Sequence, residues 1–142
     1  MLVIRSGRQP HEVMFLVFVA IVGVGGLLAP GKTANVVLKS LPPVFLILFY
    51  GVFAVGSTLA LCGAYSKGMK GPVIEAFGLG IMTAELLGYG IAVLVFAGIT
   101  AIMGSLFPLC MGIANVWRML QVRGEYKAAA ALAALKRSTE GA

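Results

Sequence analysis

Long apolar runs alternate with short polar segments along this chain. The first run covers residues 13–29, and the second, residues 44–65, starts after Pro42–Pro43 and ends at SKGMKGP. At about 1.5 Å per residue, a helix over either run reaches across a hydrocarbon core, although the first run spans only a thin one. Arg5 and Arg8 precede the first run as they would a signal peptide. Because the small-residue cleavage site is poor and equally apolar runs follow, we interpret this run as an uncleaved anchor.

A third apolar region, residues 73–120, is too long for one span. A single helix of this length would measure about 70 Å, more than twice the thickness of the bilayer core. Two spans and a tight turn fit better, and we place the turn near Gly98–Thr100, which gives spans over residues 73–97 and 100–120. The alternative turn is GSLFP, Gly104–Pro108, which leaves unequal halves. The pattern therefore predicts an all-α membrane protein with four transmembrane helices.

Polar segments border the predicted transmembrane domain, residues 13–120. Residues 1–12 form a short N-terminal segment, and residues 121–142 form a basic tail. The tail contains EYKAAAALAALKR, which is rich in strong helix formers, with Glu at its start and Lys-Arg at its end, as the helix dipole favours. We expect a cytoplasmic helix that can continue the last span through Gly124. Between the first two spans, NVVLKSL fits a short helix in the outer interface.

Composition and charge indicate where the chain lies. The sequence is 60% hydrophobic and 11% charged, whereas soluble domains have about 25% charged residues, so the surrounding solvent must be lipid. Positive charge accumulates on the cytoplasmic side of membrane proteins. Placing both termini in the cytoplasm leaves only Lys32 and Lys39 outside. The other basic residues then lie inside: Arg5, Arg8, Lys67, Lys70, Arg118, Arg123, Lys127, Lys136 and Arg137. We therefore expect a multi-pass protein of the cytoplasmic (inner) membrane.

The stretch GLLAPGKT, Gly26–Thr33, matches the G-x-x-x-x-G-K-T pattern of a phosphate-binding loop. Such a loop needs a buried strand before it, a helix after it and an Asp for the magnesium ion. Here an apolar span precedes it, and the chain has no Asp. We interpret Ala29–Pro30–Gly31 as a helix end with Gly31 in a left-handed cap. We expect neither a nucleotide nor a nucleic-acid partner.

Two carboxyl groups lie within the third predicted span. Glu85 falls near its middle, where an ionised side chain costs at least about 2.5 kcal/mol, so Glu85 should face protein or water. Apolar surroundings favour a protonated carboxyl. Glu85 is either a pore-lining or proton-handling group or a neutral, hydrogen-bonded packing residue. Glu75 lies near the cytoplasmic end, where we expect it to pair with Lys67 or Lys70.

Small residues recur every four positions in two predicted spans. Such rows let helix backbones approach closely in lipid, either within one chain or between subunits. The predicted packing rows are Gly56, Ala60 and Ala64 in the second span, and Gly80, Ala84, Gly88 and Ala92 in the third. The basic residues near the cytoplasmic surface are expected to contact anionic headgroups. These are Arg118, Arg123, Lys127, Lys136 and Arg137.

Few residues are suited to catalysis or metal binding. The chain has five Glu, one His and two Cys, and Cys62 and Cys110 sit inside apolar runs without zinc-type spacing. No acid–base or metal constellation can be assembled from them. We therefore expect no enzyme activity, no metal and no cofactor.

The layout of the chain resembles small multi-span membrane proteins of bacteriophages from high-GC hosts, including holins. The resemblance lies in the short start RSGRQPHEVMF, four Gly- and Ala-rich spans, minimal loops and the charged tail KRSTEGA. It implies a homo-oligomer that accumulates in the cytoplasmic membrane and opens a lesion for lysis. Two other hypotheses remain open: a proton- or ion-coupled transporter or accessory subunit that uses Glu85, and a structural partner in a larger membrane complex.

Overall fold

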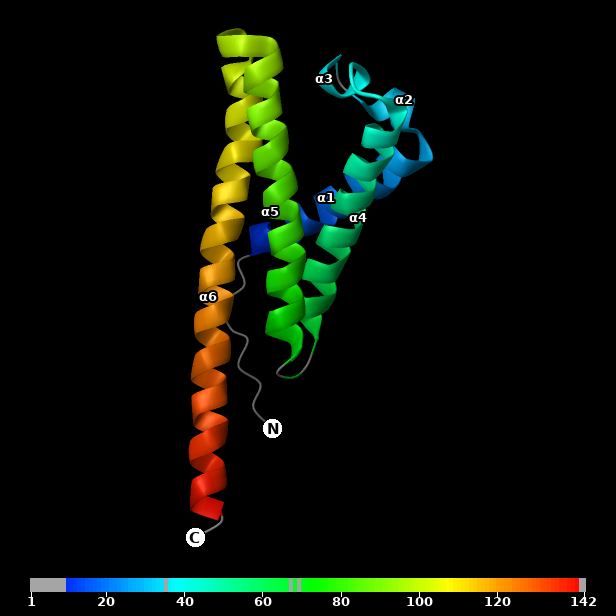
Figure 1. The fold of residues 1–142 in the computed structure, drawn as a ribbon. Coiled ribbons are helices and arrows are strands. Elements are labelled where there is room, and N and C mark those ends of the chain that lie inside the picture. Colours follow the sequence, from blue (N-terminus) through cyan, green and yellow to red (C-terminus); the bar gives the residue numbers. More distant parts are fainter. Residues whose placement is uncertain (1–9, 35, 67, 69, 141–142) are drawn as a thin grey trace.

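The computed structural model describes residues 10–34, 36–66, 68 and 70–140, and every regular element in this part of the chain is helical (Figure 1). The long helices are α1 (Pro10–Leu28), α4 (Pro43–Tyr65), α5 (Lys70–Ala97) and α6 (Ile102–Glu140). The short elements are α2 (Pro30–Thr33), α3 (Val36–Lys39) and the 3₁₀ turn η1 (Gly98–Ala101). Pro30 and Pro43 occupy the first positions of α2 and α4, where a missing backbone N–H costs nothing.

Within the described residues, three helical stretches are long and apolar enough to cross a membrane. They are Pro10–Leu28, Pro43–Tyr65 and Lys70–Thr139, of which the last contains α5, η1 and most of α6. This finding supports the assignment of the chain as an all-helical membrane protein. The helices α1, α4 and α5 each begin within three residues of the start expected from the apolar pattern.

The third stretch folds back on itself at η1 (Figure 1). Gly98 has a φ angle of 64°, a left-handed conformation that glycine adopts without a steric penalty. α5 and α6 therefore pack side by side in opposite directions. The turn lies where the sequence predicted it, and the alternative at Gly104–Pro108 is wrong because these residues lie inside α6.

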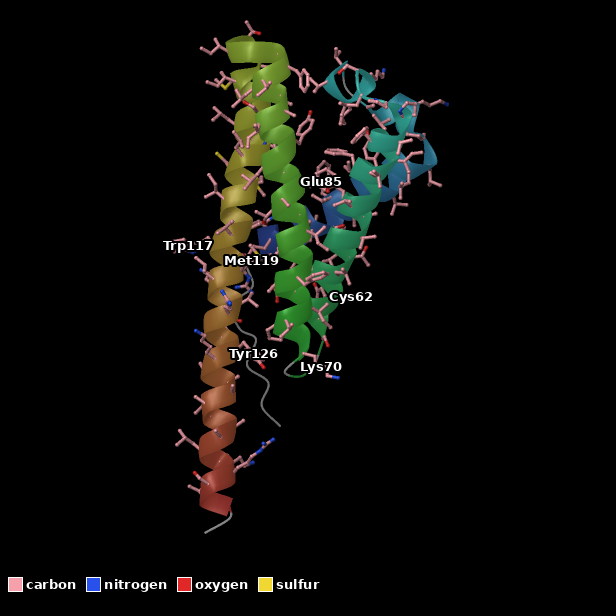
Figure 2. The ribbon with its side chains drawn as sticks, viewed as in Figure 1. Cys62, Lys70, Glu85, Trp117, Met119 and Tyr126 are labelled. Carbon is pink, nitrogen blue, oxygen red and sulfur yellow. The ribbon has the colours of Figure 1, made fainter. Side chains whose placement is uncertain are left out.

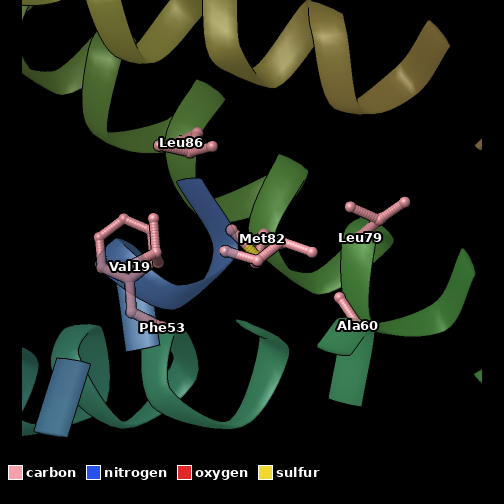
Figure 3. Packing of buried hydrophobic residues seen from close by; sticks show 7 residues of the cluster. Val19, Phe53, Ala60, Leu79, Met82 and Leu86 are labelled. Atoms are coloured by element: carbon pink, nitrogen blue, oxygen red, sulfur yellow. The ribbon is translucent and has the colours of Figure 1, made fainter. Parts of the chain in front are cut away.

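The helices pack in chain order, α1 on α4, α4 on α5 and α5 on α6. α1 crosses α4 obliquely, and α2 and α3 lie near the N-terminal end of α4 (Figure 1). The main core joins Val19 of α1, Phe53 of α4 and Met82 of α5 (Figure 3). A smaller cluster around Tyr50 packs Leu38 of α3 against α4.

Several small polar side chains are buried between the helices, and many large apolar side chains are exposed. Ser57, Thr83 and Ser105 are buried, and their hydroxyls donate to carbonyls one turn earlier in their own helices. Large apolar side chains point outward instead; they include Phe18, Phe45, Phe77, Phe96, Phe107 and Trp117. This distribution suits a lipid environment, in which small residues permit close helix contact and apolar groups face the acyl chains.

The end of α1 differs in detail from the sequence interpretation. α1 ends at Leu28. Ala29 interrupts the helix because the residue before a proline is biased away from helical geometry. Among the described residues the glycines with positive φ are Gly68 and Gly98, so the expected left-handed cap at Gly31 is wrong. α6 continues without interruption through Gly124, as the tail pattern allowed.

Candidate functional site

Glu85 lies in the middle of α5, on the side that faces α1 and α4 (Figure 2). Both of its carboxyl oxygens are shielded from solvent, and neither has a hydrogen-bond partner among the described residues. The side-chain amide nitrogen of Asn115 on α6 is also buried and has no hydrogen-bond partner among the described residues. Buried polar atoms are nearly always paired, so unpaired ones call for an explanation. The alternative of a hydrogen-bonded packing carboxyl at Glu85 is therefore not supported.

The predicted row on α4 packs within the chain. Gly56, Ala60 and Ala64 are buried where α4 meets α5. A Cβ atom at Gly78 of α5 would lie 2.4 Å from the backbone nitrogen of Ala60, and one at Gly63 of α4 would lie 2.2 Å from that of Glu75. The two backbones are thus in direct contact. Of the two readings left open for this row, the structure supports packing within one chain.

Sequence reasoning missed the α5 side of this contact. The residues that meet α4 are Gly71, Glu75 and Gly78 rather than the expected row. The spacing of seven between Gly71 and Gly78 keeps both on one helix face, and this was the available signal. It was obscured because Gly is frequent throughout the chain.

The predicted row on α5 behaves differently. A Cβ atom added at Gly80 would make only an ordinary contact, 3.6 Å from the sulfur of Met119. Ala84 and Gly88 are exposed, with open space around Gly88, and Ala92 is half-buried. Within one chain, this row therefore leaves Ala84 and Gly88 uncovered. We call these two residues the open face of α5.

The open face and Glu85 are neighbours on the helix surface. At 3.6 residues per turn, Glu85 lies about 60° from Gly88 around the helix axis. Met82, which is fully buried in the core, lies about 60° away on the other side. Glu85 is accordingly positioned at the boundary between the packed interior and the open face.

A second polar cluster ties three helices together. The guanidinium of Arg118 on α6 lies 3.5 Å from Glu75 of α5, 3.8 Å from Glu12 of α1 and 3.4 Å from Glu125 of α6. The side chains of Arg118 and Glu75 are 14% and 4% exposed. Arg118 thus differs from the exposed headgroup ligand expected from the sequence, because the carboxylates it pairs with are brought to it by the packing of α1 and α5.

The remaining predicted basic residues, Arg123, Lys127, Lys136 and Arg137, are exposed along α6. Lys70 begins α5, and Lys67 lies outside the described residues. The expected partners of Glu75 are corrected to include Arg118. The sequence did not indicate this pairing because Arg118 lies 43 positions further along the chain.

The phosphate-loop pattern has none of its required surroundings. Gly26 is inside α1, where a Cβ would overlap the ring of Tyr50, and Lys32 is exposed in the single turn of α2. No strand precedes the pattern in the described part of the chain. The absence of a nucleotide partner stays a prediction.

Across the residues that the structure describes, no group of three His, Cys or acidic side chains could hold a metal ion. Cys62 and Cys110 are exposed free thiols. Comparison with protein-family models, with curated proteins and with solved structures finds no match for this chain.

Proposed function

We propose that this protein crosses the cytoplasmic membrane four times and assembles laterally into a holin-like pore. The fold-back at η1 supports four crossings, because it divides the third apolar stretch into two antiparallel helices. The basic residues on α6 beyond Trp117 support a cytoplasmic C-terminus.

One observation carries the pore proposal: an exposed Gly–Ala face lies beside a carboxyl without a partner. Ala84 and Gly88 offer a second helix the close backbone approach that drives association in lipid. A neighbouring subunit on this face would lie next to Glu85. In the assembled form Glu85 would line the boundary between subunits, where a polar group in the membrane can meet water or an ion.

The same carboxyl supports a second candidate function. The oxygens of Glu85 are shielded by the chain itself, between α5 and the α1–α4 pair. An ionisable group enclosed within a helical bundle is typical of proton relays and cation sites. In this alternative a single chain, alone or as an accessory subunit, moves protons or a cation with Glu85 as the titrating group.

Gly88→Leu tests the pore proposal, with Gly104→Leu as its matched control. Both glycines are helical and have open space around them within one chain, so neither leucine should disturb the fold. We expect timed expression of the natural protein in bacteria to permeabilise the membrane, Gly88→Leu to abolish this effect and Gly104→Leu to retain it. Cells that stay intact and tight to small ions at high expression would refute the pore.

Glu85→Gln separates the two candidate functions. It keeps the side-chain shape and removes the titratable proton. In a transporter, Gln should abolish pH-dependent proton flux into vesicles while Gly88→Leu leaves the flux intact. If the protein forms a pore, Gly88→Leu should abolish both the conductance and the chemical cross-linking of one subunit to another. Unchanged flux in both variants, with the protein recovered alongside other membrane proteins in mild detergent, would indicate a structural role instead.

A further inference from the structure

The start of α5 and the middle of α6 border an open groove of about 420 Å³. Its walls are apolar: Pro72, Val73 and Ala76 of α5 face Val116, Met119 and Val122 of α6. Its volume lies within the range of about 300–1,000 Å³ that is usual for small-molecule sites. Figure 2 labels Met119 and Tyr126 on the part of α6 that borders this groove.

The groove is amphipathic along its length. Val116 and Met119 lie toward η1, and Arg123 and Tyr126 lie toward the C-terminus, so the groove has an apolar end and a polar end. Lys127 follows Arg123 by one helical turn, which places it on the same side of α6. Both basic side chains are exposed.

Arg118 and the Arg123–Lys127 pair lie on different sides of α6. Arg118 is five residues before Arg123, which places it about 140° away around the axis. Its charge is already engaged by Glu12, Glu75 and Glu125. Arg123 therefore provides the positive charge at the groove, and Glu125 points to the Arg118 side.

We propose that this groove binds an anionic phospholipid, with an acyl chain along the apolar walls and the phosphate at Arg123. The inference rests on the proposed placement of this end of α5 at the cytoplasmic surface. The planar guanidinium can donate two parallel hydrogen bonds to a phosphate, and Lys127 adds a second positive charge nearby. The Tyr126 hydroxyl at the rim is a further donor. A ligand with both an acyl chain and a negative headgroup matches both ends of the groove.

Native mass spectrometry of the full chain in detergent, titrated with phosphatidylglycerol or phosphatidylcholine, tests this proposal. We expect phosphatidylglycerol to bind preferentially, and Arg123→Gln to weaken it by about fivefold, the effect of one basic residue near a membrane surface. The matched control, Arg137→Gln, removes an exposed charge from the same helix away from the groove and should weaken binding less than Arg123→Gln does.

A second pair of variants tests the apolar walls. Val73→Trp fills the groove from an exposed position and should reduce binding, whereas Val95→Trp adds the same bulk at an exposed position elsewhere on α5. Equal binding of both lipids, equal losses in Arg123→Gln and Arg137→Gln, or displacement by inorganic phosphate alone would overturn the proposal. Because lipid binding is measured in detergent, the result is independent of whether the protein forms a pore.

Discussion

Gly78→Ala should separate the α4 and α5 backbones and destabilise the protein. An added Cβ at residue 78 would lie 2.4 Å from the nitrogen of Ala60 and 2.6 Å from the carbonyl oxygen of Gly56. Both are backbone atoms, which cannot move aside as the end of a flexible side chain can. Restoring ordinary contact requires a displacement of about 1 Å, which forfeits a quarter to a half of the dispersion energy of the contacts involved.

The magnitude follows from two opposing terms. Overpacking of this kind costs about 1–3 kcal/mol, while replacing a helical glycine by alanine gains up to about 1 kcal/mol in helix propensity. Because the obstacle is backbone on both sides, we expect the upper end of the cost and a net loss of about 2 kcal/mol. That loss would change the equilibrium constant for unfolding by roughly 30-fold.

Gly88→Ala is the matched control on the same helix. The chemical change is identical, but nothing lies within 4 Å of the added Cβ. Unfolding by SDS in mixed micelles, followed by circular dichroism, should therefore show a lower midpoint for Gly78→Ala and an equal or higher midpoint for Gly88→Ala. Equal stability of the Gly78→Ala variant and the natural protein, or equal losses in both variants, would refute the close α4–α5 contact.

Three further predictions can be tested in the same unfolding assay. Arg118→Gln should cost about 3 kcal/mol, because breaking a largely buried ion pair leaves charge uncompensated, and adding Glu75→Gln should recover part of the loss; strictly additive effects would argue against the pair. Gly98→Ala should cost about 1 kcal/mol because the left-handed conformation disfavours a side chain, whereas Gly104→Ala, inside α6, should be neutral or stabilising; a neutral Gly98→Ala would contradict the turn geometry. Asn115→Leu should retain or increase stability, since it removes a buried donor without a partner, and a large loss would reveal a polar contact at this amide.

The helices and their order could be predicted from the sequence because both depend on local features. Apolar length and the prolines bounding the runs located α1, α4 and α5, and Gly98 located the reversal. A glycine cap at Gly31 was a local prediction that failed, because the conformational bias that Pro30 imposes on Ala29 had already ended the helix.

The pairing of helix faces could not be predicted in the same way. A row of small residues shows that close packing is possible, but the partner helix decides which row is used. Gly78 faces α4, while Gly88 has nothing near it in the described chain, although both are glycines inside α5. Glu85 was identified because a carboxyl in an apolar span is conspicuous, whereas the surroundings of Arg118 depend on two helices distant in sequence.

The unbroken length of α6 has a mechanical consequence. Its 39 residues extend about 58 Å, of which a bilayer core accommodates about 30 Å. The remainder projects beyond α4 and α5 without support from another helix (Figure 1). A tilt of about 10° in the part packed against α5 would displace the far end by about 5 Å. In the proposed four-span topology, a small tilt of α6 within the lipid would therefore cause a larger displacement at the end of the tail.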